Sequence, residues 1–307
     1  MLVYLLDDNT LKIDSFEQVL NDQSQTHLCI LDFDTLPAVY LQLGISQKIF
    51  DECMREGNSK FEGYDGFDFI TLMIPETIRQ NKKPEHTCIY FRENLLLFIT
   101  DRSEFINDII TSSLSEEIKI PSLGRFFHLF FEALTFDDRL VLEGIEEEIS
   151  NLEEELIVSI KDDFVDSLVV FRRKLLGLKQ YYEQLLEISE AIEENENSLF
   201  NDEKLRYFKI LTKRINRLYM SVLNLRDYVT QVREAYQAQL DISLNYVMKI
   251  FTVITSIFLP LTLIVGWYGM NIMMPEFHWT YGYPFVIVLS ITVAIGTLIY
   301  FKKNKWF

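Results

Sequence analysis

The sequence is short of cysteine and of basic residues, and two long stretches lack helix breakers or charge. Cys29, Cys53 and Cys88 are isolated, without a C-x-x-C pair. They offer no disulfide framework or cysteine zinc site and fit a reducing compartment. The net charge of −17 argues against nucleic acid as a partner. The sequence contains no phosphate-binding glycine loop, so we do not expect transport driven by ATP. The four histidines are scattered along the chain, and we do not expect an enzyme (His27, His86, His128 and His278).

The C-terminal end is apolar. From Ile250 to Pro275 there is no charged residue, which is longer than the roughly 20 residues that a membrane-spanning helix needs. A second uncharged run covers Tyr283–Phe301, and a lysine-rich tail follows it. The loop at 269–282 has no Lys or Arg, whereas Lys249 and the tail are basic. The positive-inside rule therefore predicts a multi-pass protein of the cytoplasmic membrane, in contact with lipid, with both termini in the cytoplasm.

The first hundred residues favour a mixed α/β unit. Short apolar or alternating runs rich in β-formers predict strands at 2–6, 27–31, 67–74, 86–91 and 94–100. Glu93-Asn94 is typical of a tight hairpin turn. Helices are expected at 35–43 and 46–54, and a glycine-rich polar loop at 58–66. The N-terminal apolar run is too short and lacks the basic flank of a signal peptide, so we expect this region to stay in the cytoplasm.

Long helices follow. The pattern predicts one helix from Ser122 with a polar continuation over 144–156, a second at 164–194, a linker at 195–201 and a third from Asp202 to Trp267. No Gly or Pro occurs between Leu178 and Leu259, so the third helix would be roughly 100 Å long. We expect an α+β cytoplasmic domain, consisting of an α/β/α-type sheet unit with long helices, and a C-terminal transmembrane hairpin. The expected segments are an α/β domain (1–120), a long-helix region and stem (121–245), a first span (246–268), an external loop (269–282), a second span (283–301) and a basic tail (302–307).

Charge is sorted between these helices. Residues 143–155 are rich in Glu, whereas 204–217 carry six Lys or Arg, and no acid occurs between Lys204 and Met220. One interpretation is salt-bridged packing between antiparallel helices or neighbouring subunits. The other is an electrostatic path that offers acidic sites to divalent cations, although no cluster has EF-hand spacing.

The first span carries a stripe of small, hydroxylic or flexible side chains at steps of three and four (Asn245, Met248, Thr252, Thr255, Leu259, Thr262 and Gly266). Such a stripe suits either a helix–helix contact or the lining of a pore. Two spans cannot enclose a pore, so the second interpretation requires a ring of several copies.

Tyr268-Gly269-Met270-Asn271, at the outer end of the first span, resembles the signature of the CorA family of magnesium channels. Met274-Pro275-Glu276, a following Trp and the basic tail agree with it. The resemblance covers the whole organisation of the chain. It implies a homopentamer whose first spans line a pore, with Gly269, Met270 and Asn271 as the selectivity filter that holds hydrated Mg²⁺ and Glu276 attracting cations nearby. It also implies the pore-lining set Asn245, Met248, Phe251, Thr252, Thr255, Leu259, Thr262 and Gly266. Phe251 stands where the family often has Leu.

The resemblance implies a second role for Mg²⁺, as a regulatory ligand bound between subunits. The sequence departs from the family here, because the corresponding part of the stem is the basic stretch 204–217. Asp65 and Asp68 are the N-terminal candidates for such a site. The main hypothesis is thus uptake of Mg²⁺, with Co²⁺ or Ni²⁺ as similarly hydrated ions. The alternatives are transport of another ion such as Zn²⁺, against which the intact Met270 and Asn271 argue, and a non-transporting membrane-anchored helical scaffold.

Overall fold

The computed structural model describes residues 1–7, 10–21, 25–55, 57, 59–79, 83–101, 103–115, 120, 122–158, 164–270, 279–304 and 306. The chain divides into two compact units, Met1–Gln231 and Val232–Phe307. Helix α9 (Asp202–Tyr268) contributes residues to both units.

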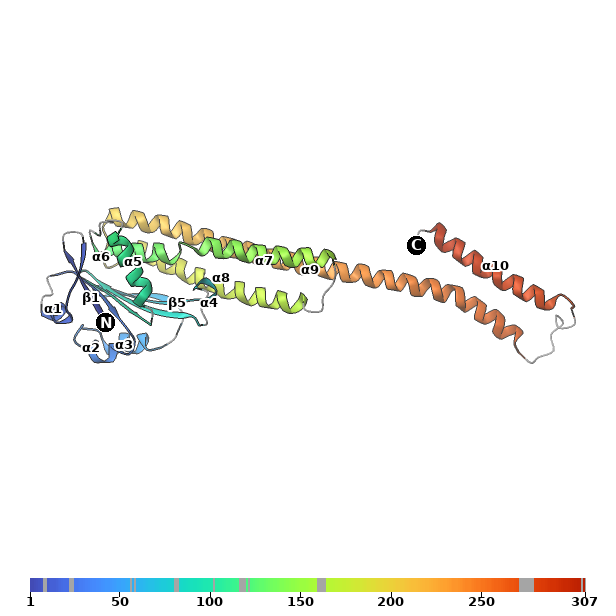
Figure 1. Ribbon diagram of the computed structural model, residues 1–307, viewed down its shortest axis with the longest axis horizontal. Helices are drawn as coiled ribbons and strands as arrows, with labels where there is room; N and C mark the ends of the chain where they lie inside the picture. Colours follow the sequence, from blue (N-terminus) through green and yellow to red (C-terminus); the bar gives the residue numbers. More distant parts are fainter. Residues whose placement is uncertain are drawn as a thin grey trace. The chain divides into compact units, whose positions relative to one another are not determined.

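The described strands of the first unit form one seven-stranded sheet in the order β2-β1-β3-β7-β6-β5-β4 (Figure 1). The strands are β1 (Leu2–Asp7), β2 (Thr10–Ile13), β3 (His27–Leu31), β4 (Lys60–Tyr64), β5 (Phe67–Ile74), β6 (Glu85–Arg92) and β7 (Leu95–Thr100). β3 and β7 pair in parallel, and the other neighbours are antiparallel. The five predicted strands are confirmed, as is the hairpin turn at Glu93-Asn94, because Arg92 pairs with Leu95.

Two local predictions for the first hundred residues were wrong. The polar stretch at 58–66 contains strand β4, which pairs with β5 through a turn where Gly66 adopts a φ of +82°. The strand was missed because its Lys and Glu residues interrupt the apolar pattern by which strands are predicted. Such residues are permitted here because this edge strand is only partly buried. The helix expected at 35–43 is shorter than predicted: α2 covers only Leu36–Val39. Turns follow it as far as Gly44, whose φ is +74°.

Helices cover both faces of the sheet, as expected for an α/β/α unit (Figure 1). One face packs against α1 (Phe16–Asn21), α2 and α3 (Gln47–Cys53), whose N-cap Ser46 accepts a hydrogen bond from the Ile49 amide. The other carries α5 (Ser103–Ser115) and α6 (Leu123–Leu134), where Phe98 contacts Phe126 and Phe130. The short α4 (Glu76–Arg79) follows β5.

Three long helices complete the first unit: α7 (Asp138–Val158), α8 (Phe164–Glu194) and the N-terminal part of α9. The bounds of α8 and α9 agree with the predicted helices, and the linker between them lies where it was expected. The helix expected to continue from Ser122 into 144–156 is interrupted at Thr135, where the hydroxyl donates to the Phe131 carbonyl and α6 ends. A buried hydrogen bond of 3.0 Å from the Tyr182 hydroxyl to Asp138 Oδ2 then ties the start of α7 to α8.

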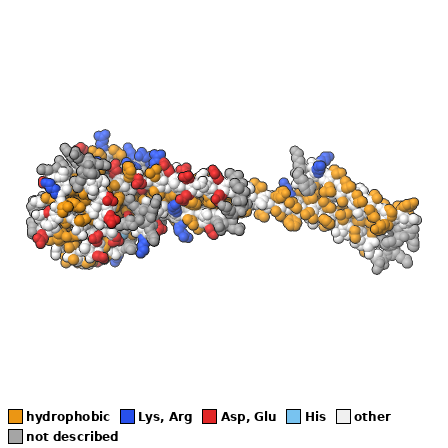
Figure 2. Space-filling model, viewed as in Figure 1, with side chains coloured by type: hydrophobic (Ala, Val, Ile, Leu, Met, Phe, Trp, Pro, Cys, Tyr) orange, Lys and Arg blue, Asp and Glu red, His pale blue; other side chains and the backbone are white. Residues whose placement is uncertain are grey.

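The second unit consists of the C-terminal part of α9 and helix α10 (Gly282–Lys303). Both helices are long and apolar enough to cross a membrane, with mean hydropathies of 2.1 and 2.2 and 6% of each apolar window buried. Figure 2 shows hydrophobic side chains covering their surface. Soluble proteins rarely expose so continuous an apolar surface to water, so we expect these helices to be covered by lipid or by other protein.

Candidate functional site

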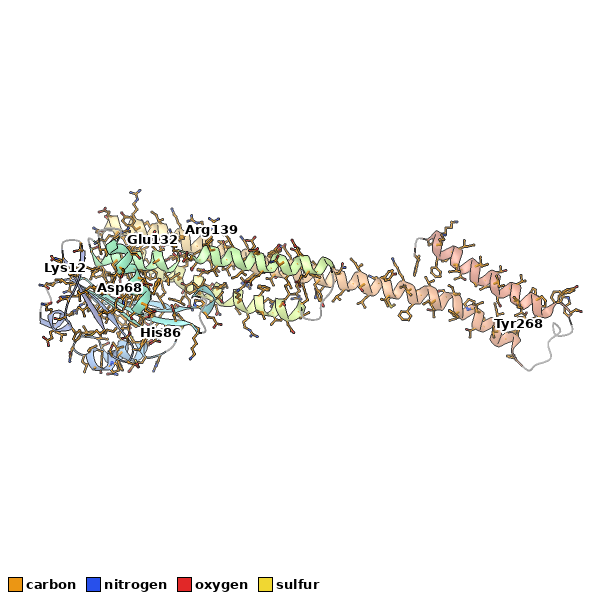
Figure 3. The ribbon with its side chains drawn as sticks, viewed as in Figure 1. Lys12, Asp68, His86, Glu132, Arg139 and Tyr268 are labelled. Atoms are coloured by element: carbon orange, nitrogen blue, oxygen red, sulfur yellow. The ribbon has the colours of Figure 1, made fainter. Side chains whose placement is uncertain are left out.

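The candidate site starts where α9 ends. Tyr268 is the last helical residue, and the Gly269 amide still donates to the Val265 carbonyl at 2.9 Å (Figure 3). A Cβ at Gly269 would lie 2.7 Å from that carbonyl oxygen, so only glycine fits this conformation without a backbone shift. Met270 follows and is exposed. Asn271 and Glu276, the other predicted residues of this loop, lie outside the described residues.

The predicted stripe lies along one surface of α9. None of its side chains is buried: Thr252 is half-buried and the others are exposed (Asn245, Met248, Phe251, Thr255, Leu259, Thr262 and Gly266). At about 100° per residue these positions share one face of the helix. Val253, which is 5% exposed, lies off this face. The stripe is therefore a continuous, accessible strip of mixed polarity that leads to Gly269.

The hydroxyls of the three threonines in the stripe donate hydrogen bonds to carbonyls of their own helix. The hydroxyls of Thr252 and Thr262 donate to the carbonyls of Met248 and Phe258, each at 2.8 Å. Thr255 donates to the Phe251 carbonyl in the same way. A hydroxyl whose proton is already donated offers its lone pairs to other donors. The stripe thus presents hydrogen-bond acceptors without presenting charge.

Pro260 stands inside this part of α9. It has no amide hydrogen to give to the carbonyl four residues earlier, that of Ser256. The helix nevertheless continues through it to Tyr268.

The two acids predicted for regulation have different surroundings. Asp65 is exposed in the β4–β5 turn. Asp68 is 6% exposed and accepts a 2.7 Å hydrogen bond from the Asn197 side chain. Burial, and secondarily the charge of Glu196, raises the pKa of Asp68 above its ordinary value, against the effect of that hydrogen bond. Among the described residues, no three His, Cys, Asp or Glu side chains gather as a metal site.

The sorted charges do not pair as the simplest interpretation expects. Of the six cations between 204 and 217, Arg214 alone has an ion pair within the described residues, at 3.7 Å from Glu132 of α6 rather than from the acids of α7. Glu148 of α7 pairs instead with Lys174 of α8 at 3.4 Å. Sequence patterns had also missed Arg139, which lines the groove beside Arg214 although 75 positions separate them.

The described histidines lie in three separate environments. His27 contacts Asp14 at 3.3 Å, His86 stacks on Phe33, and His128 lies beside Arg125 at 3.1 Å. Burial is the main cause that lowers the pKa of His128. His278 lies outside the described residues. His86 also lies 3.5 Å from the Cys88 thiol, whose pKa is raised by its hydrogen bond with Cys53 and by burial, so this buried thiol is not an activated nucleophile.

Comparisons with known proteins agree on one family. The model of the CorA-like Mg²⁺ transporter protein family matches residues 27–303. The cobalt/magnesium transport protein CorA of Thermotoga maritima is 29% identical over 254 residues, which cover 80% of this chain and 72% of that protein. The magnesium transport protein CorA of Helicobacter pylori is 28% identical over 311 residues, covering 99% and 79%.

Solved structures share the fold. The complete CorA magnesium transporter of Methanocaldococcus jannaschii superposes with a TM-score of 0.83 at 18% identity, covering 100% of this chain and 99% of that one. The cytoplasmic domain of ZntB from Vibrio parahaemolyticus gives a TM-score of 0.65 at 13% identity, covering 78% and 98%. The predicted fold class, an α+β domain with long helices and a C-terminal apolar hairpin, is therefore confirmed. The family model covers nearly the whole chain, and the protein belongs to the CorA-like Mg²⁺ transporter family.

Proposed function

We propose that this protein is a Mg²⁺ channel of the cytoplasmic membrane, assembled as a homopentamer, that admits Mg²⁺ to the cell. The observation that carries the proposal is the accessible stripe of α9 that leads to Gly269 and Met270 in a member of a Mg²⁺ transporter family. One hairpin cannot enclose a water-filled path, so the stripes of several copies must face each other.

The chemistry of the motif suits a hydrated ion. Mg²⁺ gives up its water reluctantly, so a pore that keeps the shell intact avoids a large barrier. Side-chain oxygens of Asn271 and backbone carbonyls of Gly269 accept hydrogen bonds from that shell without the strong attraction of a carboxylate cage. Met270 completes the filter, and Glu276 raises the local cation concentration at the mouth.

Further along the proposed pore, the threonines repeat this chemistry. Because their hydroxyl protons go to helix carbonyls, Thr252, Thr255 and Thr262 face the path as acceptors. Water bound to Mg²⁺ is a donor, so it matches them. Asn245 adds an amide at the cytoplasmic end, and Gly266 leaves width for the shell.

Apolar residues alternate with these acceptors. Met248, Phe251 and Leu259 are 63%, 64% and 68% exposed in the single chain. Rings of such side chains form constrictions that exclude water when narrow, which is a means of gating. Phe251 is the bulkiest of the three and is the proposed principal constriction.

Orientation follows from charge. Lys302 and Lys303 form the basic end of α10, and by the positive-inside rule they support the proposal that both termini lie in the cytoplasm. The membrane potential, negative inside, then drives Mg²⁺ inward, at about 2.3 kcal/mol per elementary charge for each 100 mV.

A regulatory role for Mg²⁺ belongs to the same proposal. Asp65 is the accessible acid for such a site. Asp68 is buried and would first have to release the Asn197 side chain. Asp65 is therefore the residue to test first.

The test is Mg²⁺ flux into liposomes that hold a Mg²⁺-sensitive dye under an inside-negative potential. Wild type and Asn271→Ala would be compared with Asn216→Ala, the same substitution at an exposed position of α9 in the first unit. We expect flux in wild type and Asn216→Ala and its loss in Asn271→Ala. Equal flux in all three would place selectivity elsewhere. Flux of Zn²⁺ or Co²⁺ but not Mg²⁺ would favour the alternative ions, and folded protein that passes none of them would favour the scaffold.

A further inference from the structure

The N-terminal part of α9 carries a basic strip on the side turned away from its own core. Phe208, Leu211, Ile215, Leu218 and Val222 are the buried side of the helix. Arg206, Lys209, Lys213 and Arg217 are exposed on the opposite side, at helical spacing. Figure 2 shows Lys and Arg side chains gathered over this part of α9, next to acidic side chains over α7.

These four cations make no ion pair within the part of the chain that the structure describes. Lys209, Lys213 and Arg217 follow each other at intervals of four, where like charges on a helix repel. The chain has 46 acidic residues against 29 basic ones, so a second copy offers an excess of acidic side chains to such a row. Acidic groups of a partner would offset the repulsion between its cations.

The strip is not purely charged. Ile210 is 56% exposed and Tyr207 40% exposed between the cations. Beside them, Arg125, His128, Glu132, Leu211 and Arg214 line a hollow of about 180 Å³. Arg125 lies over the Tyr207 ring at 4.8 Å, which holds that ring in place. Apolar and aromatic side chains within an arginine-rich rim are the composition of a protein interface rather than of a site for a free anion.

The strip extends into a groove between α7 and α9. Arg214 lines both hollows, and Arg139, Arg217, Phe136 and Tyr228 are among the other residues of the groove, whose volume is about 850 Å³. Phe136 is 72% exposed at its edge. Figure 3 shows Glu132 and Arg139 near each other at the end of α6 and the start of α7.

We propose that this basic strip docks against an acidic surface of a second copy of the same chain. The inference rests on the proposed function, which requires several copies, and adds the surface and the kind of force that join them. The partner copy has the matching charge, since each chain carries a net −17. Ile210 and Tyr207 supply the apolar centre of the contact, and the cations around them fix its register. The protein's own cations, rather than a bound divalent ion, neutralise the partner's acids at this strip.

Thiol accessibility in the assembled protein tests this contact locally. The natural cysteines are at most 1% exposed, so a single introduced cysteine is the one that reacts quickly with a thiol reagent. Ile210→Cys would be compared with Val170→Cys, because Val170, on α8 outside the strip, is 61% exposed in the single chain. In full-length detergent-solubilised protein at low salt, we expect Ile210→Cys to react about tenfold or more slowly than Val170→Cys.

Three changes of condition sharpen the test. High NaCl, or Lys213→Glu with Arg217→Glu, should raise the reactivity of Ile210→Cys to that of Val170→Cys. Arg172→Glu with Arg173→Glu, an equal change of charge at exposed positions of α8, should not. EDTA should leave the protection intact, because the strip holds cations of its own. Circular dichroism checks that each variant keeps its helices.

Equal reactivity of the two cysteines in an assembled protein would overturn the inference while leaving the channel intact. Release of protection by EDTA alone would also overturn it, in favour of a divalent ion between subunits. Protection that appears only on adding inorganic phosphate would indicate an anion site instead. The mass measured by light scattering separates these cases from failure of the proposed function, since a folded monomer in all conditions would remove the assembly itself.

Discussion

Thr262→Val removes one acceptor per copy from the proposed pore and keeps the shape of the side chain. Thr262 donates to the Phe258 carbonyl at 2.8 Å, so what the path loses is its oxygen lone pairs. A hydrated ion in contact with two such hydroxyls at a time would lose two hydrogen bonds of about 1 kcal/mol each. A total of about 2 kcal/mol corresponds to about a 30-fold fall in flux.

The assay is the liposome flux measurement, with two controls. Thr262→Ser keeps the hydroxyl and should retain most of the flux. Thr292→Val removes the same kind of bond from α10, where Thr292 donates to the Val288 carbonyl at 2.8 Å, and should leave the flux unchanged. If Thr262→Val and Thr292→Val conduct equally well, Thr262 does not face the ion and the reasoning is refuted.

Three further substitutions test other parts of the molecule. Gly269→Ala forces a Cβ to 2.7 Å from the Val265 carbonyl and should abolish flux without dispersing the assembly, whereas Gly296→Ala, where a Cβ meets nothing within 4 Å, should be silent in both measurements. Tyr182→Phe leaves the buried Asp138 without its 3.0 Å hydrogen bond and should lower the stability of the first unit by about 1.5–3 kcal/mol, seen as a lower Tm by circular dichroism; an unchanged Tm would show that the bond contributes nothing. Asp68 has a raised pKa in the fold, so its contribution to stability is lost as the pH rises from about 4 through the folded value. Asp68→Asn still accepts from Asn197 and should therefore raise Tm at neutral pH, with a gain that shrinks toward pH 4; a lower Tm at neutral pH would contradict this.

The long helices and most strands were predictable because their signals are local. The third helix agrees with its predicted bounds within one residue, Tyr268 against Trp267, because no glycine or proline occurs in it before Pro260. Pro260 is tolerated inside it, which local propensity does not anticipate. Strand β4 was missed because it lies at the sheet edge, where polar side chains are permitted.

The site was predictable only in part. The spacing of the α9 stripe defines a helix face, so the alignment of its residues followed from sequence. Their exposure does not single them out, because most side chains of this part of α9 are exposed in the single chain. The burial of Asp68 against Asn197 did not, because the two residues are 129 positions apart. The meeting of Arg139, Arg214 and Tyr228 around one groove likewise depends on the packing of α7 on α9.

The most direct test of the central claim is whether the stripe faces water in the assembled membrane protein. Thr255→Cys on the stripe and Ile254→Cys beside it would each be treated with a membrane-impermeant cationic thiol reagent while Mg²⁺ flux is recorded. The natural cysteines do not interfere, since they are buried and burial raises the pKa of Cys29 to about 12. The proposal predicts block of flux in Thr255→Cys and none in Ile254→Cys. Modification of both, or block through Ile254→Cys alone, would contradict the claim that this stripe lines the ion path.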